Sequence, residues 1–561
     1  MPLPPPPNRP PGTVRFHTLG GLGEVGMNCA VLETDAGILL IDCGVNFPET
    51  DHYGIDVHIP DFSFLEQHRD RLLGLIVTHG HQDHIGAIPW LLREFDLPIW
   101  SSRLALTMIR ESLVEHELDG RARLHRVEAG DVVDFPDVEV EFIHINHSIP
   151  ECLALALRTP AGLFVHTADF KIDHTPFGEP SIDLPRFAEL GDEGVRCLFS
   201  DSTNVERDGF TGSEQTAREH LIDTVRNATG RVFVAMFSSN LFRVQALIDA
   251  AHLSGRRIVP LGWSLNRNIR IGRELGLLKL PGKDPFLSVE DAKGLPPERL
   301  LVLATGSQGE PRAALTRVAR GDFRGLDLGE GDLVVFSARI IPGNERSVHA
   351  LQDDIIRAGA RILTARERPI HVSGHACREE QKLMLRLVRP EILVPVHGDH
   401  RFLVSHAALG ALCDVPEQHV LDNGDVLEFT EDSCAVVGHH AARRVVVENG
   451  TVGDADSLAL RERARLARLG YCVIWAVVDG ETGELEEGPV LQTRGIVDEG
   501  DAGEQVLQEA RDAARAAVEA LTPDRRRRKD EVAEALRLTV RRTFRKQLQR
   551  KPLVESIVYV V

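Results

Sequence analysis

Four potential metal ligands stand within six residues of the chain: His79, His81, Asp83 and His84. They follow an apolar β-branched run, residues 75–77, which predicts a buried strand. If the chain stays extended beyond this strand, the first three side chains project to one side, and a helix starting just after the fourth turns it to a second position. Imidazole and carboxylate together suit zinc or manganese. The stretch therefore predicts a site for one metal ion or two, and a polar loop with incidental histidines is the less favoured alternative.

Further candidate ligands stand at the ends of apolar segments elsewhere in the chain. His147, Asp169 and His397 each follow such a segment, and residues 195–204, which contain Asp201, repeat the pattern. Loops at strand ends commonly carry chemistry. Asp42 also ends a buried strand, where an unpaired carboxylate would be costly. Its expected role is to support the metal ligands, and an ordinary turn aspartate is the alternative.

The elements that must position these residues belong to a chain of 561 residues, long enough for three or four domains. No apolar run approaches the roughly 20 residues that a membrane span needs. The eight cysteines include no C-x-x-C pair, which favours reduced thiols and a cytoplasmic protein. A net charge of −20 argues against a generally basic nucleic-acid-binding surface but leaves a local basic channel possible.

The pattern changes near residue 212, where apolar strand-like runs begin to alternate with helix-like ones. Ser213 is expected to cap a helix beginning at Glu214. The alternation predicts a parallel sheet covered by helices, with small polar groups at several strand ends, among them Ser238-Ser239-Asn240. Ligands of such sheets bind at the carboxyl ends of the strands, and helix N-termini favour phosphate. These residues therefore indicate a phosphate-rich ligand, although each cluster singly could be turn chemistry.

The last part of the chain adds two further features. Residues 371–375 and the segment ending at His397 return to loop-borne histidines. Beyond an expected linker at 440–460, a small α/β domain is expected, with helices at 503–520 and 529–549. The second helix is basic. A solvated face is the default interpretation, and a nucleic-acid or subunit contact is the alternative.

Taken together, the H-x-H-x-D-H run and the later aspartates and histidines resemble the metallo-β-lactamase superfamily. The long interval between Asp169 and His397, filled by the α/β segment, resembles the β-CASP nucleases within it. Nearly the whole chain resembles the bacterial ribonuclease J family. The motifs that carry this resemblance are residues 20–28, 45–48, 78–84, 146–150, 166–170, 201–204, 341–345, 371–375 and 395–398. Two departures are visible: Gln82 stands where Glu is usual and Ala168 where Gly is usual.

The resemblance implies an α/β fold in which a metallo-β-lactamase αββα sandwich is interrupted by a parallel-sheet β-CASP domain and followed by a small C-terminal α/β domain. The expected boundaries are a proline-rich disordered arm at 1–12, the sandwich at 13–211, the β-CASP domain at 212–366, the rest of the sandwich at 367–440, a linker at 441–460 and the last domain at 461–561.

The resemblance also implies roles for the residues. His79, His81 and His147 are assigned to one metal ion, Asp83, His84 and His397 to another, and Asp169 to both. Two ions about 3.5–4 Å apart can activate water for in-line attack on phosphorus, and Asp83 could orient it. Asp201 is expected to be catalytic and His375 to be the general acid; a hydrogen-bonded structural histidine is the alternative for His375. The terminal phosphate is expected to be bound by Ser238, Ser239, Asn240, His371, Val372, Ser373, Gly374 and His375.

The implied function is a ribonuclease acting 5′→3′ on 5′-monophosphorylated single-stranded RNA, with some endonuclease activity, in mRNA decay and rRNA maturation. Zinc is the favoured metal and manganese the alternative. A homodimer or homotetramer and RNA-degradation partners are expected. The alternatives are a β-CASP endonuclease, a DNA nuclease, a small-molecule metallohydrolase and a non-catalytic RNA-binding scaffold. The intact set of candidate ligands argues against the scaffold.

Overall fold

The computed structural model describes residues 9–48, 54–341, 343–440, 442–455 and 457–561. Most of the expected N-terminal arm lies outside these residues. The chain divides into two compact units, of which the first runs to Asn46 and from His58 to Arg443. The second combines Phe47–Val57 with Arg444–Val561. Each unit is described below by itself.

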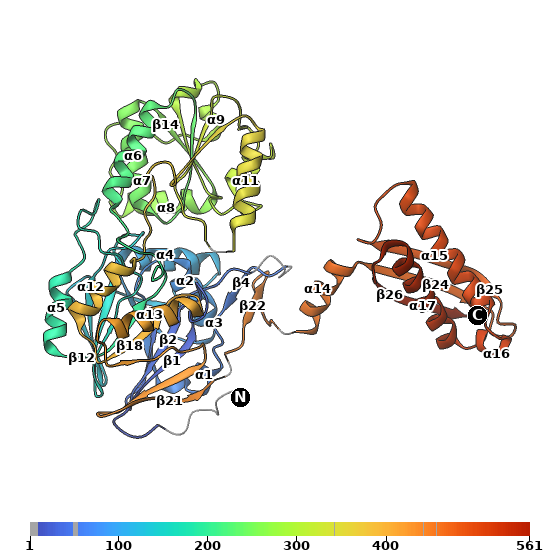
Figure 1. The fold of residues 1–561 in the computed structure, drawn as a ribbon, viewed down its shortest axis with the longest axis horizontal. Helices are drawn as coiled ribbons and strands as arrows, with labels where there is room; N and C mark the ends of the chain where they lie inside the picture. The colour runs from blue at the N-terminus through green and yellow to red at the C-terminus, as the bar shows by residue number, and fades with distance from the viewer. Residues whose placement is uncertain (1–8, 49–53, 342, 441, 456) are drawn as a thin grey trace. The chain divides into compact units, whose positions relative to one another are not determined.

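Two facing β-sheets form the lower part of the first unit (Figure 1). The described strands of one sheet are, in spatial order, β21 (Cys434–His439), β20 (Asp425–Phe429), β1 (Val14–Gly20), β2 (Cys29–Glu33), β3 (Ile38–Ile41), β5 (Leu72–Ile76), β6 (Pro98–Ser101) and β7 (Arg123–Arg126). Those of the other are β19 (Glu417–Gln418), β18 (Ile392–Val396), β12 (Val195–Asp201), β11 (Gly162–His166), β10 (Leu153–Thr159), β9 (Val138–His144) and β8 (Val132–Phe135).

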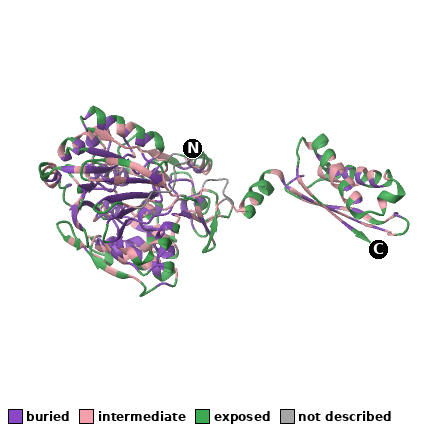
Figure 2. Cartoon of the chain, turned by 90° about the horizontal axis from the view of Figure 1, so that it is seen from below, coloured by how far each residue is buried: buried purple, intermediate pink, exposed green. Residues whose placement is uncertain are grey.

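The core between the two sheets is built from residues that alternate inward along the strands. Phe16 of β1 stacks on Phe199 of β12 with ring centroids 4.0 Å apart, and Phe429 packs on Phe164. Such burial of apolar surface is the main favourable contribution to folding. Figure 2 shows the buried strands inside this unit and exposed surfaces on many of the helices.

Helices cover the outer faces of both sheets. On one side α4 (Arg103–Glu115) packs on β6 and β7, and on the other α5 (Leu184–Glu193) packs on β12 and α13 (His400–Leu412) on β18. The expected αββα sandwich is therefore confirmed. Other helices on this part of the chain are α1 (Ser63–Gln67), α2 (Gln82–Ile85), α3 (Ile88–Glu94) and α12 (Arg378–Val388).

A parallel sheet with helices on both faces is inserted between β12 and β18, as expected (Figure 1). Its described strands, all paired in parallel, are β14 (Arg257–Leu261), β15 (Leu300–Ala304), β13 (Val232–Ala235), β16 (Leu333–Phe336) and β17 (Arg361–Thr364). Its helices are α6 (Glu214–Asn227), α7 (Leu241–Ser254), α8 (Trp263–Glu274), α9 (Val289–Ala292), α10 (Ala314–Ala319) and α11 (Glu345–Arg357). Ser213 caps α6 at the backbone N–H of Gln215, so the expected helix start is confirmed.

After the insertion, the chain returns to the sheet of the sandwich and forms β18 beside β12, the last strand before the insertion. β18 pairs in parallel with β12, and Val396 lies opposite Asp201 in the register. Because the carboxyl ends of parallel strands meet at one edge of the sheet, the residues that follow the two strands are brought side by side. This pairing places His397 next to Asp201, although the inserted domain separates them in the sequence.

The second unit has its own hydrophobic core. It contains the strands β25 (Leu485–Arg494), β24 (Tyr471–Val478) and β26 (Leu553–Val560) and the helices α15 (Asp501–Glu519), α16 (Pro523–Arg526) and α17 (Lys529–Leu548). The segment expected to be a linker contains the paired strands β22 (Val445–Glu448) and β23 (Thr451–Asp454), followed by α14 (Leu458–Leu469). The β-branched run Val445-Val446-Val447 explains this hairpin, since such residues favour strands.

Candidate active site

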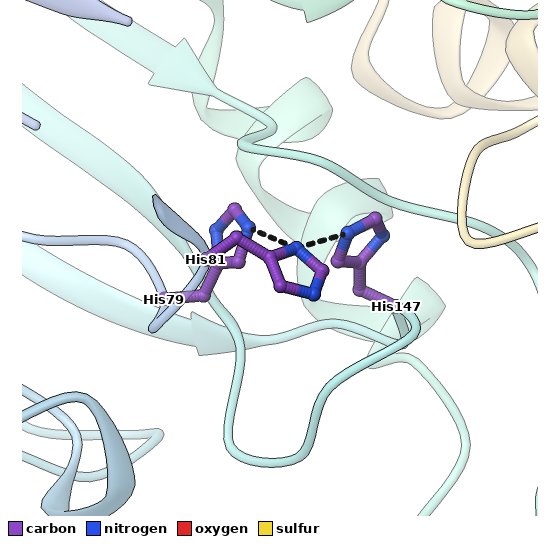
Figure 3. A group of neighbouring side chains, drawn as sticks. All are labelled: His79, His81 and His147. Atoms are coloured by element: carbon purple, nitrogen blue, oxygen red, sulfur yellow. Dashed lines mark hydrogen bonds between the residues drawn. The ribbon is translucent and has the colours of Figure 1, made fainter. Parts of the chain in front are cut away.

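Three buried or half-buried histidines form one group of candidate ligands (Figure 3). His79 and His81 follow β5, and His147 follows β9 of the opposite sheet. The Nδ1 atom of His81 lies 3.1 Å from the Nε2 of His79 and 3.1 Å from the Nε2 of His147. Three ring nitrogens that face one another cannot all be satisfied by shared protons, whereas one cation can accept all three lone pairs.

Asp169 connects this group with a second one. Its Oδ2 lies 3.2 Å from the Nε2 of His84, 3.3 Å from the Nε2 of His397 and 3.8 Å from the Nε2 atoms of His79 and His147. Asp83 completes the second group, with its Oδ2 3.4 Å from His397 Nε2. One carboxylate oxygen therefore stands between two sets of candidate ligands.

The backbone around these ligands differs from the extended run that the sequence predicted. The helix starts at Gln82, so that Asp83 lies in the first turn of α2 rather than on an extended segment. The geometry follows from contacts with the first sheet: the carbonyl of Asp83 accepts the backbone N–H of Asn28, and that of His84 accepts the N–H of Cys43. The helical turn directs Asp83 and His84 to the second group instead of the first.

Hydrogen bonds to the other ring nitrogens fix the orientation of several candidate ligands. Asp42 Oδ2 accepts from His84 Nδ1 at 2.8 Å, and the same carboxylate accepts from the backbone and hydroxyl of Thr78. The Nδ1 of His147 donates to the carbonyl of Gly374 at 2.7 Å. Such outer contacts set the tautomer and the direction of a metal-binding imidazole. The structure thus places Asp42 where the sequence predicted a supporting carboxylate.

Burial keeps the histidines of the first group neutral, whereas nearby carboxylates raise the pKa of the histidines of the second group. Burial lowers the pKa of His79 and His147 well below the ordinary value and that of His81 to about 4, so these rings are neutral, the form that binds metals. Burial alone would also lower the pKa of His84 and His397, but the negative charge of Asp169 and its neighbours raises both well above the ordinary value. The same negative field would favour a bound cation.

The donor set fits two divalent cations. Within each of the two groups, one ligand atom per residue lies within 4.8 Å of all the others. Neither group contains a thiol. Their donors are imidazole nitrogens and carboxylate oxygens, a combination that both zinc and manganese accept. The residues that would hold one ion are His79, His81 and His147, and those that would hold the other are Asp83, His84 and His397. Asp169 belongs to the second group and lies 3.8 Å from His79 and His147 of the first.

A carboxylate–imidazole pair lies beside these groups. His375 Nδ1 lies 2.8 Å from Asp201 Oδ2, and the His375 ring packs against the rings of His147 and His397 at 4.8 and 5.1 Å between centroids. Burial would raise the pKa of Asp201, but His375 and His397 lower it well below the ordinary value, so the carboxylate stays ionised. The His375 side chain is 19% exposed and can reach a bound molecule.

The predicted phosphate-binding residues fall on two neighbouring loops. Ser238 and Ser239 form a turn after β13, and the side chain of Asn240 accepts from the backbone N–H of Arg243 at the start of α7. Arg243 in turn donates to the carbonyl of Ile370, directly before His371. One buried residue, Arg243, therefore bonds to both loops, through its backbone N–H to Asn240 and through its guanidinium to Ile370.

The second of these loops has cationic neighbours and contains a buried ring nitrogen without a hydrogen-bond partner among the described residues. His371 Nδ1 is buried without a hydrogen-bond partner among the described residues. Burial, with the positive charges of Arg243, Lys171 and Arg339, lowers the pKa of His371 to about 3, although Glu214 opposes the effect. An anion bound here would meet this positive field.

Within this loop, Ser373 accepts from Asn204 Nδ2 at 2.9 Å, Val372 is buried and the Gly374 carbonyl holds His147. Gly374 is thereby tied to a candidate metal ligand, and Ser373 to the segment that follows the strand carrying Asp201.

Sequence reasoning missed the charged residues that hold these loops together. Arg243 is 1% exposed and pairs with Glu214, while Arg339 donates to Asn204 Oδ1. A signal for Arg243 was present, because a lone arginine among Leu241, Phe242 and Val244 must find partners when buried. No comparable local signal distinguishes Arg339 from an exposed arginine.

Comparisons with known proteins agree with this architecture. Residues 22–170 match the metallo-beta-lactamase superfamily, residues 229–355 the ribonuclease J beta-CASP domain, residues 360–412 the Zn-dependent metallo-hydrolase RNA specificity domain and residues 458–561 the ribonuclease J C-terminal domain. The chain is 38% identical to ribonuclease J of Mycolicibacterium smegmatis, covering 99% of each chain. It is also 38% identical to ribonuclease J 1 of Streptococcus pyogenes, covering 89% of this chain and 90% of the relative.

The chain belongs to the ribonuclease J family. Membership makes it a metal-dependent hydrolase of the nuclease class with a metallo-β-lactamase domain, a β-CASP insertion and a C-terminal domain. A crystal structure of a protein of unknown function from Enterococcus faecalis V583 shares the fold over 74% of this chain, with a TM-score of 0.51 and 14% identity. In the part of the chain that the structure describes, no helix combines the length and the apolar character needed to cross a membrane.

Proposed function

We propose that this ribonuclease J family member hydrolyses single-stranded RNA from the 5′ end, preferring a 5′-monophosphate, with additional endonuclease activity. The observation that carries the proposal is that Asp169 stands between two groups of candidate metal ligands, with His375 beside both. Family membership supports RNA as the substrate, because the relatives are named ribonucleases.

Two divalent cations in these groups would supply Lewis acidity, activating water and neutralising charge that develops on the phosphate oxygens. We favour zinc, with manganese as the alternative, since both accept the donor set. Asp83 is half-exposed and can orient the attacking water by accepting a hydrogen bond from it.

His375 is proposed to protonate the departing 3′-oxygen. Its Nδ1 is engaged with Asp201, which leaves Nε2 to donate a proton to the leaving group. The ionised Asp201 fixes the direction of the His375 ring, and Thr203 holds the other oxygen of Asp201 through its N–H and hydroxyl. Asp201 is therefore a positioning residue, and His375 touches the substrate.

The loops 238–240 and 371–375 are proposed to hold the 5′-phosphate. Ser238 and Ser239 offer hydroxyl and backbone donors after β13, and the cationic surroundings of His371 favour an anion. Capture of the terminal phosphate at a fixed distance from the metal groups would set the register for removal of single nucleotides.

The cellular setting is also a proposal. The eight cysteines are all unpaired, which fits a reducing compartment such as the cytoplasm. Roles in mRNA decay and rRNA maturation, RNA-degradation partners and a homodimer or homotetramer are proposed from the family resemblance.

The test is a time course on one RNA sequence labelled at either end, with zinc or manganese added to the purified full-length protein. The proposal expects mononucleotides from 5′-monophosphorylated RNA and slower cleavage of the 5′-triphosphorylated form. Equal rates on single-stranded DNA would indicate a DNA nuclease, and internal cuts alone an endonuclease. Turnover of nitrocefin without cleavage of RNA would replace the proposal by a small-molecule hydrolase.

A further inference from the structure

Another group of potential metal ligands lies far from the candidate active site. Glu417, His419 and Cys434 place one carboxylate oxygen, one imidazole nitrogen and one thiol sulfur within 4.8 Å of one another. Among the groups of potential ligands found in the described residues, it is the one that contains a cysteine.

The group joins the two sheets of the sandwich. Glu417 lies on β19, at the edge of one sheet, and His419 follows it two residues later, so that both side chains project from the same face of the extended segment. Cys434 begins β21, at the edge of the other sheet. An ion bound by these residues would link two sheet edges that otherwise meet through side-chain packing.

Register places the group at the end of the sheet opposite to the active site. Glu417 pairs with Ile392 at the start of β18, whereas His397 follows the end of that strand. Along the chain, His397 lies five residues beyond Ile392, which at about 3.3 Å per residue is a separation of roughly 16 Å. The group is therefore separate from the proposed catalytic ligands.

The side chains have few other partners. The Nε2 of His419 lies 2.6 Å from Oε1 of Glu417, and no hydrogen bond to the Cys434 thiol is found in the described structure. Cys434 is half-buried, whereas the other seven cysteines are buried. Arg196, the nearby positive charge, is engaged by Glu391. A partly accessible thiol beside a histidine and a carboxylate is the combination that binds zinc.

We propose that Glu417, His419 and Cys434 form a structural zinc site with water as the fourth ligand. Nitrogen and oxygen ligands of one tetrahedral zinc ion lie roughly 3.4 Å apart at bonds of about 2.1 Å, and a thiolate sulfur, bound at about 2.3 Å, lies roughly 3.6 Å from them. The hydrogen bond between Glu417 and His419 would open slightly on binding, and Cys434 would move toward them. The thiol would lose its proton to the solvent as the zinc–sulfur bond forms.

Cobalt gives a readout specific to this site. In wild-type protein loaded with Co²⁺, thiolate ligation produces a charge-transfer absorption in the near ultraviolet, which the nitrogen and oxygen ligands of the active site cannot produce. The band is expected in the wild-type protein, and Cys434→Ser and His419→Ala should each remove or strongly reduce it. Zinc-loaded variants should contain about one zinc per chain fewer than the wild type and unfold at a lower temperature, while RNA cleavage persists.

Cys413→Ser is the matched control, because this cysteine is 8% exposed and lies among charged residues of α12 rather than beside Glu417. It should keep both the band and the zinc content. A wild-type protein without the thiolate band would overturn the proposal, as would a Cys434→Ser variant that keeps it. If neither variant folds, the wild-type spectrum alone decides.

Discussion

At the scale of single residues, the active site depends on side chains that are each held by a second partner. Asp42 orients His84, Gly374 orients His147 and Asp201 orients His375. Ala168, directly before Asp169, adopts a left-handed conformation with φ 50°, as does His397 with φ 56°. Strain of this kind persists where the surroundings fix the backbone, and it is common at functional sites. At Ala168 it also explains why glycine would be the easier residue there.

Replacing His375 tests the general-acid proposal. His375→Ala should lower kcat on 5′-monophosphorylated RNA by about 10²–10⁴-fold, the usual contribution of a positioned proton donor. KM and the metal content should change little, because the other candidate ligands remain. Single-turnover kinetics and elemental analysis measure these quantities, and His349→Ala, an exposed histidine on α11, is the control. Wild-type rates for His375→Ala would refute the assignment.

The buried carboxylate Glu33 predicts a pH-dependent contribution to stability. Burial would raise its pKa, but hydrogen bonds from His17 and Arg71 lower it from 4.5 to about 2. Since the folded-state pKa is depressed, the stabilisation is complete above pH 4.5 and is lost as the pH falls toward 2. Glu33→Gln should cost about 1–3 kcal/mol at neutral pH. Thermal unfolding of both proteins should show the difference shrinking below pH 4.5; a gap independent of pH would contradict the prediction.

At the scale of elements, the site is built where strand ends from both sheets meet. β5 supplies the loop with His79, β9 leads to His147 and β18 leads to His397. The parallel pairing of β12 and β18 is the decisive contact, because it closes the site across the inserted domain. Displacements of about 1 Å in such a site can cost 10²-fold in rate.

Gly374 shows how closely the loop before α12 approaches these ligands. A Cβ atom at this position would lie 2.6 Å from Cε1 and 2.7 Å from Nδ1 of His147. Gly374→Ala should therefore displace the His147 ring and lower kcat at least about 10-fold, with weaker metal binding. Kinetics and metal titration measure the two effects. Gly329→Ala, which has open space around the added atom, should behave as the wild type.

At the scale of the whole molecule, the two units have independent cores, and the second presents surface suited to association. Along β24, Cys472, Ile474, Ala476 and Val478 are buried, whereas the alternate residues are only half-buried. The edge strand β26 exposes Tyr559 by 59% and Val560 by 44%. Exposed apolar groups on an edge strand favour pairing with another chain.

A chain ending at Arg443 is predicted to keep metal binding and basal RNA cleavage, because all proposed active-site residues lie in the first unit. Its mass in solution should fall to that of a monomer, since the proposed subunit contacts are removed. Light scattering and cleavage assays test both points, and Tyr559→Asp in the full chain should weaken association without loss of fold. An unchanged oligomer in the truncated protein would place the interface elsewhere.

The sequence by itself determined the ligand types, the strand ends that carry them and the alternation of strands and helices from residue 212 onward. These features are local: apolar runs set the elements, and polar residues at their ends set the candidates. The expected helix beginning at Glu214 is confirmed for the same reason.

The family resemblance implied a grouping of the candidate ligands, but the spacing of the residues did not, and only the tertiary structure shows which turn each ligand occupies. The start of α2 at Gln82 depends on hydrogen bonds to the strand ends near Asn28 and Cys43, and the roles of Arg243 and Arg339 depend on loops that are remote in sequence. The approach of Glu417 and His419, at the edge of one sheet, to Cys434, at the edge of the other, has no local signal either. Contacts between distant segments are set by how the sheets pack, and a single sequence records the residues without the packing.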